Sequence, residues 1–364
     1  MPDQMTSPLV YDAISRQWQE RADAGRDYTV IRNDNIFRSS FTDSYIFESD
    51  FRSAGSLLAS LVDRYQGCRV EEAVPGMVEE TGDGDCYRID TRVPLCVPVS
   101  AEAGVRERLC SELTLIWGIG QKTAGELRKR GYHRIPDLVH HRKYQRRAVE
   151  CLSTIEHADP ETLTRWVSRV SSPAHPLSML TSGLFPPDRL VFLDLETLGF
   201  FSRPIILFGV GTFEGQDLVV SQFLLRGIEE ELPALLRTAG MLGPGKVAVT
   251  YNGKSFDLPY LRERLAFYGE FPPLAGVHFD LLHHSRRRWR NRFPDCRLST
   301  LEKRLFGVQR EEDVPSAMVP EFYEAYLRTG NPGPLVPIVE HNRQDVVSLA
   351  RLFALLSEEC NECA

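Results

Sequence analysis

Two acidic residues stand at the end of an apolar run that is typical of a buried β-strand. The run at residues 190–193 reads Leu-Val-Phe-Leu, and Asp194 and Glu196 follow it. Side chains two positions apart on a strand share a face, so both carboxylates point the same way. Two ionised carboxylates about 4 Å apart repel each other by roughly 4 kcal/mol at an effective dielectric near 20. A divalent cation reverses the sign of this interaction, and oxygen ligands favour Mg²⁺ or Mn²⁺ over Zn²⁺.

Two further acids occur in settings that favour the same location. Asp257 follows a short β-branched strand predicted over 246–251 and a turn, which places it at the carboxyl end of a sheet. Asp345 lies within the apolar stripe of the last helix, predicted over about 335–357, and therefore faces the core. His341 lies four residues earlier and shares that face. Taken singly, each acid is also typical of a solvated loop or a cap, and His341 of a helix surface.

These residues form three motifs in a fixed order. They are Asp194-x-Glu196, then Tyr251-Asn252-Gly253-x-x-Phe256-Asp257-x-Pro259-x-Leu261, then His341-x-x-x-Asp345. The set resembles the DEDD 3′→5′ exonucleases of the ribonuclease H-like superfamily, and in particular the YprB-type ribonuclease H-like domain. The resemblance covers roughly residues 188–358, about half of the chain.

The resemblance implies a two-metal site and a set of catalytic residues. Two divalent ions, Mg²⁺ or Mn²⁺, would be held by four ligands: Asp194, Glu196, Asp257 and Asp345. Glu196 and His341 are the implied catalytic residues, with His341 orienting or deprotonating the attacking water and a nucleoside 5′-monophosphate as product. The histidine subgroup of the family places His five residues before the last Asp, and the tyrosine subgroup places Tyr four before it. This chain has histidine at the tyrosine spacing. The candidate nucleic-acid contacts of the second motif are Asn252, Lys254 and Phe256.

A glycine hairpin at Gly118 and Gly120 lies between two predicted helices within residues 113–127. Glycine lets the backbone turn tightly and approach another backbone closely, and a helix that starts after such a turn presents free N–H groups to an anion. The stretch resembles the helix-hairpin-helix motif, which grips the nucleic-acid backbone without reading its sequence. The resemblance implies phosphate contacts at Gly118 and Gly120, with Lys122 and Thr123 nearby. A glycine-rich hairpin within an ordinary helical bundle is the alternative.

Local charge favours phosphate binding beside this hairpin. Residues 111–150 hold nine Lys and Arg against four acids, a formal charge of +5, whereas the whole chain carries −7. Any contact with nucleic acid must therefore depend on local basic faces and not on the overall charge.

A second basic run at residues 286–292 contains Arg287, Arg288 and Trp289. Arginine interleaved with tryptophan can hold phosphates and stack on an unpaired base. The alternative is a solvated helix face with Trp289 half buried. His283 and His284 precede the run, but no third soft ligand completes a metal site with them.

The cysteines and the apolar runs bear on the cellular setting. We expect the eight cysteines to be free thiols in a reducing cytosol. The alternative is a zinc site or a metal cluster held by four irregularly spaced cysteines, Cys68, Cys86, Cys96 and Cys110. No apolar run reaches the roughly 18 residues that cross a bilayer, and the start of the chain has no signal pattern. We therefore expect a cytoplasmic protein with no membrane partner.

Composition shifts predict four parts along the chain. They are an N-terminal α+β region of unassigned role over 1–103, a helical region with the helix-hairpin-helix over 104–170, a Pro/Ser-rich linker over 171–187, and a ribonuclease H-like domain over 188–364. Within the last part, strands are predicted over 190–196, 204–213, 217–225 and 246–251, with a helix over 228–239. This pattern predicts an α/β fold in which helices flank a mixed sheet. In the first part we expect a helix over 53–65 and a β-hairpin over 77–97.

The sequence thus predicts a metal-dependent 3′→5′ exonuclease that releases 5′-mononucleotides. The hairpin motif favours single-stranded or 3′-tailed DNA as partner, with RNA as the alternative because both polymers share the phosphate. Two other interpretations remain, a structure-specific nuclease that trims flaps or overhangs at the same site, and a catalytically silent DNA-binding scaffold in a repair complex. Repair or replication proteins are candidate partners, and the sequence does not set the oligomeric state.

Overall fold

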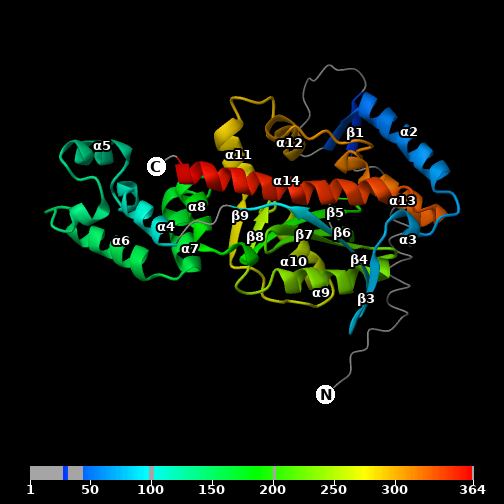
Figure 1. Cartoon of the computed structure of the whole chain (residues 1–364), viewed down its shortest axis with the longest axis horizontal. Helices are drawn as coiled ribbons and strands as arrows, with labels where there is room; N and C mark the ends of the chain where they lie inside the picture. Colours follow the sequence, from blue (N-terminus) through cyan, green and yellow to red (C-terminus); the bar gives the residue numbers. More distant parts are fainter. Residues whose placement is uncertain (1–27, 32–43, 98–101, 200–201, 363–364) are drawn as a thin grey trace.

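A seven-stranded sheet lies at the centre of the computed structural model, which describes residues 28–31, 44–97, 102–199 and 202–362 (Figure 1). The strand order is β3-β4-β7-β6-β5-β8-β9. The strands are β3 (Met77–Thr81), β4 (Gly84–Pro94), β5 (Leu190–Thr197), β6 (Ile205–Glu214), β7 (Asp217–Leu224), β8 (Val247–Thr250) and β9 (Val277–Asp280).

The sheet is mixed. Strands β5, β6 and β7 form an antiparallel meander, whereas β8 pairs parallel to β5 and β9 parallel to β8. This arrangement confirms the predicted α/β fold with a mixed sheet flanked by helices. The four strands expected from the sequence correspond to β5, β6, β7 and β8. Strand β9 was not expected, because His278 and Asp280 interrupt its short apolar pattern.

Helices cover both faces of the sheet (Figure 1). The long helix α14 crosses one face, and α9 and α10 cover the other. The helices of this half are α9 (Glu231–Met241), α10 (Asp257–Phe267), α11 (Leu281–Trp289), α12 (Leu298–Phe306), α13 (Val319–Thr329) and α14 (Leu335–Glu362). Short 3₁₀ turns precede α9 and α13, namely η5 (Ile228–Glu230) and η6 (Ser316–Met318). None of the helices in the described ranges combines the length and the apolar character that a membrane span requires.

The hairpin of the N-terminal region extends the central sheet. Strand β4 pairs antiparallel with β7 from Tyr87 to Pro94, and β3 pairs with β4 at the edge. Tyr87 is buried in the same core as Val191 of β5. Helices α2 (Glu48–Arg64) and α3 (Val70–Ala73) belong to this region, as does a parallel pair of strands, β1 (Tyr28–Ile31) and β2 (Ser44–Phe47).

The helical region before β5 also shares the core of the sheet. Its elements are α4 (Glu102–Cys110), η1 (Leu113–Leu115), α5 (Gln121–Lys129), η2 (Ile135–Leu138), α6 (Gln145–His157), α7 (Pro160–Ser171), α8 (Pro176–Leu180), η3 (Thr181–Leu184) and η4 (Pro187–Arg189). Figure 1 shows α5 and α6 at the end of the molecule away from α2 and α13.

The stretch 171–187, which the sequence predicted to be a linker, is packed structure. Met179 and Phe185 are buried, and α8 packs against α14. Proline starts a helix here instead of marking a flexible connection, because Pro176 is the first residue of α8 and the His175 ring accepts a hydrogen bond from the Leu177 N–H.

Glycines on β6 let α14 approach the sheet closely. A methyl group at Gly211 would lie 2.7 Å from Val346 Cγ1, and one at Gly209 would overlap the side-chain amide of Asn342. The contact between β5, β6 and the helix therefore depends on these two missing side chains.

We expect Gly211→Ala to lower the free energy of unfolding by about 1–3 kcal/mol, because the added methyl group overpacks this contact. Urea titration followed by circular dichroism measures the effect. The control is Gly104→Ala on an exposed face of α4, where no atom approaches within 4 Å and alanine should be neutral or slightly stabilising. Equal stability of the two variants would show that α14 does not pack this tightly on β6.

Candidate active site

Alternate side chains at the end of β5 face α14. The Phe192 ring packs edge-on against Phe353 of that helix, with centroids 5.6 Å apart. Two residues further on, Asp194 Oδ2 accepts a 2.8 Å hydrogen bond from the Asn342 side chain of α14. Glu196 Oε1 lies 3.8 Å from His341 Nε2. Asp194 and Glu196 therefore share the face that α14 covers.

Helix α14 carries Asp345 one turn beyond His341. The distance from His341 Nε2 to Asp345 Oδ2 is 3.6 Å. Both side chains are largely buried, with 8% of His341 and 17% of Asp345 exposed. The helix thus brings its acid and its histidine to the acids of β5.

Asp257 is the first residue of α10 and is buried. The turn before it is held by Asp280 at the end of β9, whose carboxylate accepts hydrogen bonds from the Asn252 N–H at 2.8 Å and the Lys254 N–H at 3.0 Å. Asn252 takes a left-handed backbone conformation with φ of 69°, which asparagine tolerates better than most residues. Two strand ends, β8 and β9, therefore fix the position of Asp257.

The predicted ligands act on one another electrostatically. Burial raises the pKa of Asp194 well above its usual value, and the charges of Asp345 and Asp257 raise it further. Burial also raises the pKa of Glu196, with added repulsion from Asp194 and Asp345. The pKa of Asp257 rises to about 7, mainly through burial, and Glu196 contributes to the rise. The fold therefore gathers four acids that oppose one another's ionisation.

This donor set suits a divalent metal, but its ligands are not preassembled. Carboxylate oxygens are preferred by Mg²⁺ and Mn²⁺, and a cation would relieve the repulsion. In the parts of the chain that the structure describes, however, no three His, Cys, Asp or Glu side chains stand ready around a metal position. Asp345 instead accepts a hydrogen bond from Arg310, and Asp194 accepts one from Asn342. A metal ion would have to compete with Arg310 for Asp345.

Arg310 is a buried cation that the sequence analysis missed. Its guanidinium donates to Asp345 and, at 3.0 Å, to Glu302 Oε2 of α12. Only 10% of the Arg310 side chain and 2% of the Glu302 side chain are exposed. The stretch around Arg310 is rich in charges of both signs and follows a helix, which is typical of a solvated loop, so the sequence gave no signal.

Asp313 orients the His341 ring. The Nδ1 atom lies 2.7 Å from Asp313 Oδ1 and 3.1 Å from Arg310 Nη1. A guanidinium only donates, so the proton on Nδ1 is best placed toward Asp313. Burial alone lowers the pKa of His341, but Asp345, Asp313 and Glu196 outweigh it and raise the pKa to about 10. The other nitrogen, Nε2, faces Ser316, Glu196 and Asp345.

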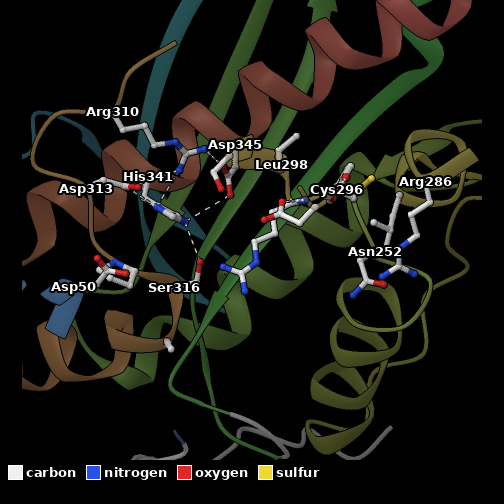
Figure 2. Close-up of a pocket in the computed structure, with 17 residues that line it drawn as sticks. Asp50, Asn252, Arg286, Cys296, Leu298, Arg310, Asp313, Ser316, His341 and Asp345 are labelled. Carbon is white, nitrogen blue, oxygen red and sulfur yellow. Dashed lines mark hydrogen bonds and ion pairs between the residues drawn. The ribbon is translucent and has the colours of Figure 1, made fainter. Parts of the chain in front are cut away.

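A pocket of about 760 Å³ opens beside His341 and Asp345 (Figure 2). Its lining continues to Asn252 and to Arg286 of α11 on the opposite side. Asp50 of α2 also lines it, so the N-terminal region contributes to the wall. The volume lies within the range of small-molecule and cofactor sites.

The glycine hairpin lies at the exposed start of α5. Gly118, Gly120 and Lys122 are exposed, and Thr123 is partly buried. Gly118 has φ of 89°, and Gly120 precedes the helix in an extended conformation with no side chain to cap it. The first helix of the predicted pair is shorter than expected, because residues 113–115 form the single 3₁₀ turn η1.

Apolar residues pack this region as the sequence predicted. The buried ones are Leu115, Ile116, Ile119, Ala124 and Leu127. In contrast, 77% of Trp117 is exposed, and the Arg147 guanidinium lies over its ring at 4.7 Å from the centroid. The tip of the hairpin thus presents an aromatic ring beside several cations.

The second basic run does not form the predicted stacking surface. Only 2% of Trp289 is exposed, and its ring stacks on Phe293, so it cannot stack on a base. Arg287 and Arg288 are exposed on α11. The prediction for Trp289 was wrong because an aromatic residue in a basic run can equally well anchor the helix to the core.

The other predicted nucleic-acid contacts lie in the turn before α10, and the histidine pair precedes the basic run of α11. Asn252 and Lys254 are exposed, and the partly buried Phe256 ring packs against Tyr260 with centroids 5.2 Å apart. His284 is buried, and burial lowers its pKa to about 4. No metal-binding group of His, Cys, Asp or Glu occurs among the described residues, and the four cysteines Cys68, Cys86, Cys96 and Cys110 are free thiols.

Asn342 is a further residue that sequence reasoning missed. It is fully buried and connects the Gln222 side chain, which donates to its Oδ1 at 2.8 Å, to Asp194. The available signal was a polar residue within the apolar stripe of a buried helix, next to a candidate catalytic histidine. The amide fixes the Asp194 carboxylate from the helix side.

Comparison with known proteins agrees with this geometry. Residues 191–357 match the family model RNase_H_2, described as RNase_H superfamily. The chain is also similar to the protein named "Uncharacterized protein YprB" of Bacillus subtilis (strain 168), with 32% identity over 204 residues, which are 55% of this chain and 48% of that protein. The chain therefore spans about half the length of this relative. Residues 191–357, which contain all four acids and His341, are thus similar to the RNase_H superfamily.

Proposed function

We propose that this chain is a metal-dependent 3′→5′ exonuclease that hydrolyses DNA, with RNA as the alternative substrate. The observation that carries the proposal is the gathering of four acids beside His341, on a segment that matches the RNase_H superfamily model. Burial and neighbouring charges raise the pKa of three of them, Asp194, Glu196 and Asp257. Similarity to this superfamily supports a nuclease-type hydrolase that binds nucleic acid. The direction of cleavage, the DNA preference and a pair of metal ions are the parts that the experiments below test.

The residues that would hold divalent ions are Asp194, Glu196, Asp257 and Asp345. A bound Mg²⁺ or Mn²⁺ ion would neutralise the charge that develops on the phosphoryl group and would lower the pKa of a water molecule. The chain itself orients the other groups. Asn342 holds Asp194, and Asp280 holds the turn before Asp257.

His341 is the proposed proton-transfer group, and Nε2 is its reactive atom. Asp313 keeps the proton of the ring on Nδ1, so Nε2 is left to accept a proton from water on the side of Glu196 and Asp345. In the absence of metal the surrounding acids hold this histidine protonated. Neutralising those acids would lower its pKa toward the range in which imidazole acts as a base.

The glycine hairpin is the proposed contact with the nucleic-acid backbone outside the acid site. The exposed N–H groups at the start of α5 and Lys122 offer a site for a phosphate. The adjacent cations and the exposed Trp117 favour a nucleic acid over other anions. This contact would add affinity without base specificity.

We expect Asp194→Asn to lower hydrolysis at least about a thousandfold, which corresponds to roughly 4 kcal/mol of lost transition-state stabilisation. The free energy of unfolding measured in EDTA should stay unchanged or rise, because one member of the repelling cluster loses its charge while the amide can still bond Asn342. The assay uses 5′-labelled, 3′-labelled and internally labelled oligonucleotides of DNA and RNA with Mg²⁺, Mn²⁺ or EDTA.

The products of the wild-type protein decide between the proposed activity and its rivals. Release of mononucleotides from the 3′ end supports the exonuclease. A single internal cut near a junction would instead identify a structure-specific nuclease, and no cleavage with either metal would favour a binding scaffold.

Arg310→Gln should lower the free energy of unfolding in EDTA by about 3 kcal/mol, because it leaves the buried Glu302 and Asp345 without their cation. Added Mn²⁺ should raise the melting temperature of this variant more than that of the wild type, since the metal no longer competes with a guanidinium. Arg304→Gln at an exposed position of α12 is the control. Melting curves with the same Mn²⁺ response in all three proteins would contradict competition at Asp345.

Lys122→Gln should weaken binding to duplex DNA by a similar factor for all sequences and reduce the slope of log K against log salt by about 0.9. Lys129→Gln, at the exposed far end of α5, is the control with the same loss of charge. Fluorescence anisotropy at several salt concentrations measures both. An effect on sequence preference, with affinity for random DNA retained, would rule out a backbone contact.

A further inference from the structure

The pocket beside the acid site has two chemically different ends. One end holds His341, Asp313 and Asp345, and the other holds Asn252 and Arg286 (Figure 2). Arg297 also lines the pocket. These ends come from distant segments of the chain, α14 with the loop before η6 on one side and α11 with the start of α12 on the other. A polyanion bound at the acids would therefore meet arginines as it leaves them.

The acids that line the pocket already have partners within the chain. Asp345 pairs with Arg310, and Asp313 with His341. Asp295 accepts a 3.0 Å hydrogen bond from the Arg297 N–H and so stabilises its own turn. Among the described residues, Arg286 forms no ion pair with an acid. Its charge acts on the pocket wall, where it lowers the pKa of Tyr251 and Cys296 against the effect of burial.

Helix geometry separates Arg286 from its neighbours in the basic run. Successive residues on a helix point about 100° apart, and of the three arginines at positions 286–288 it is Arg286 that lines the pocket. Arg287 and Arg288 are exposed elsewhere on α11. Of these three arginines, only Arg286 is thus positioned for a ligand in the pocket.

We infer that Arg286 and Arg297 bind the phosphates of a single nucleic-acid strand that runs through this pocket to the acid site. The inference rests on the proposed nuclease function and assigns its strand-binding residues. A volume of about 760 Å³ suits a ligand of a few nucleotides. Arginine is the side chain best suited to hold a phosphate with two hydrogen bonds.

The N-terminal region gains a role from the same geometry. Asp50 of α2 lines the pocket. Arg64, the last residue of α2, forms a bidentate ion pair with Glu312 through hydrogen bonds of 3.1 and 2.7 Å. Glu312 belongs to the loop that carries Arg310 and Asp313. Helix α2 therefore supports the wall opposite the arginines.

The test measures binding of a 5′-fluorescein hexathymidylate to the full chain in EDTA, so that no cleavage occurs. A strand this short reduces the contribution of contacts outside the pocket. The double variant Arg286→Gln/Arg297→Gln should bind 10- to 100-fold more weakly, with the slope of log K against log salt reduced by about 1.4, the value for two phosphates of a single strand. The control Lys303→Gln/Arg304→Gln removes the same charge from exposed positions of α12 that do not line the pocket, and it should change affinity less than twofold.

Cleavage of longer strands in Mg²⁺ separates failure of this inference from failure of the proposed function. The pocket variant should raise KM more than it lowers kcat, and the wild type should degrade 3′-tailed DNA at least tenfold faster than blunt duplex. If the wild type cleaves strands but the pocket variant binds the hexamer as tightly as the wild type and the control variant do, the inference is wrong and the nuclease assignment stands. If the wild type cleaves no strand with Mg²⁺ or Mn²⁺, both the proposed nuclease function and this inference are wrong. Unchanged melting temperatures exclude loss of the fold as the cause.

Discussion

Repulsion between buried carboxylates is the constraint on which this structure depends. Asp194 and Glu196 share one face of a central strand, and α10 and α14 add Asp257 and Asp345 to the same place. Such a cluster opposes folding unless cations or protons compensate it. Burial, together with the neighbouring charges, raises the pKa of three of these acids, Asp194, Glu196 and Asp257. A protein that maintains this arrangement has stability elsewhere to offset it, which points to chemistry that needs the charges together.

Compensation comes from a loop far from the acids in sequence. Arg310 neutralises Asp345 and Glu302, and Asp313 with the acids keeps His341 charged. Two positive groups of the chain itself, Arg310 and His341, therefore offset part of the negative charge of the cluster. The loop is thus part of the electrostatics of the acid site and not simply a connection between α12 and α13.

Local patterns predicted the parts of the fold that are fixed by local physics. The strand at 190–196 follows from its apolar run, and the shared face of its acids follows from the alternation of side chains. Trp289 shows the limit, because composition around a residue does not decide whether its ring faces solvent or core. The sequence analysis did not foresee how the stretch 171–187 and the β3–β4 hairpin pack, for a related reason. Pairing of β4 with β7 and packing of α8 on α14 join segments distant in sequence, and no local pattern reports such contacts. Arg310 and Asn342 were missed because their partners are also remote.

The unit that supports the acid site is larger than the ribonuclease H superfamily segment at 191–357. Without β4, the edge of β7 would expose unpaired N–H and C=O groups along eight registered residue pairs. Tyr87 and Ile89 would also leave the core that Val191 and Leu207 share. The same N-terminal region holds the pocket loop through the pair of Arg64 with Glu312. Strand pairing at one side of the sheet and an ion pair at the pocket thus make α2 and the β3–β4 hairpin part of the site's framework.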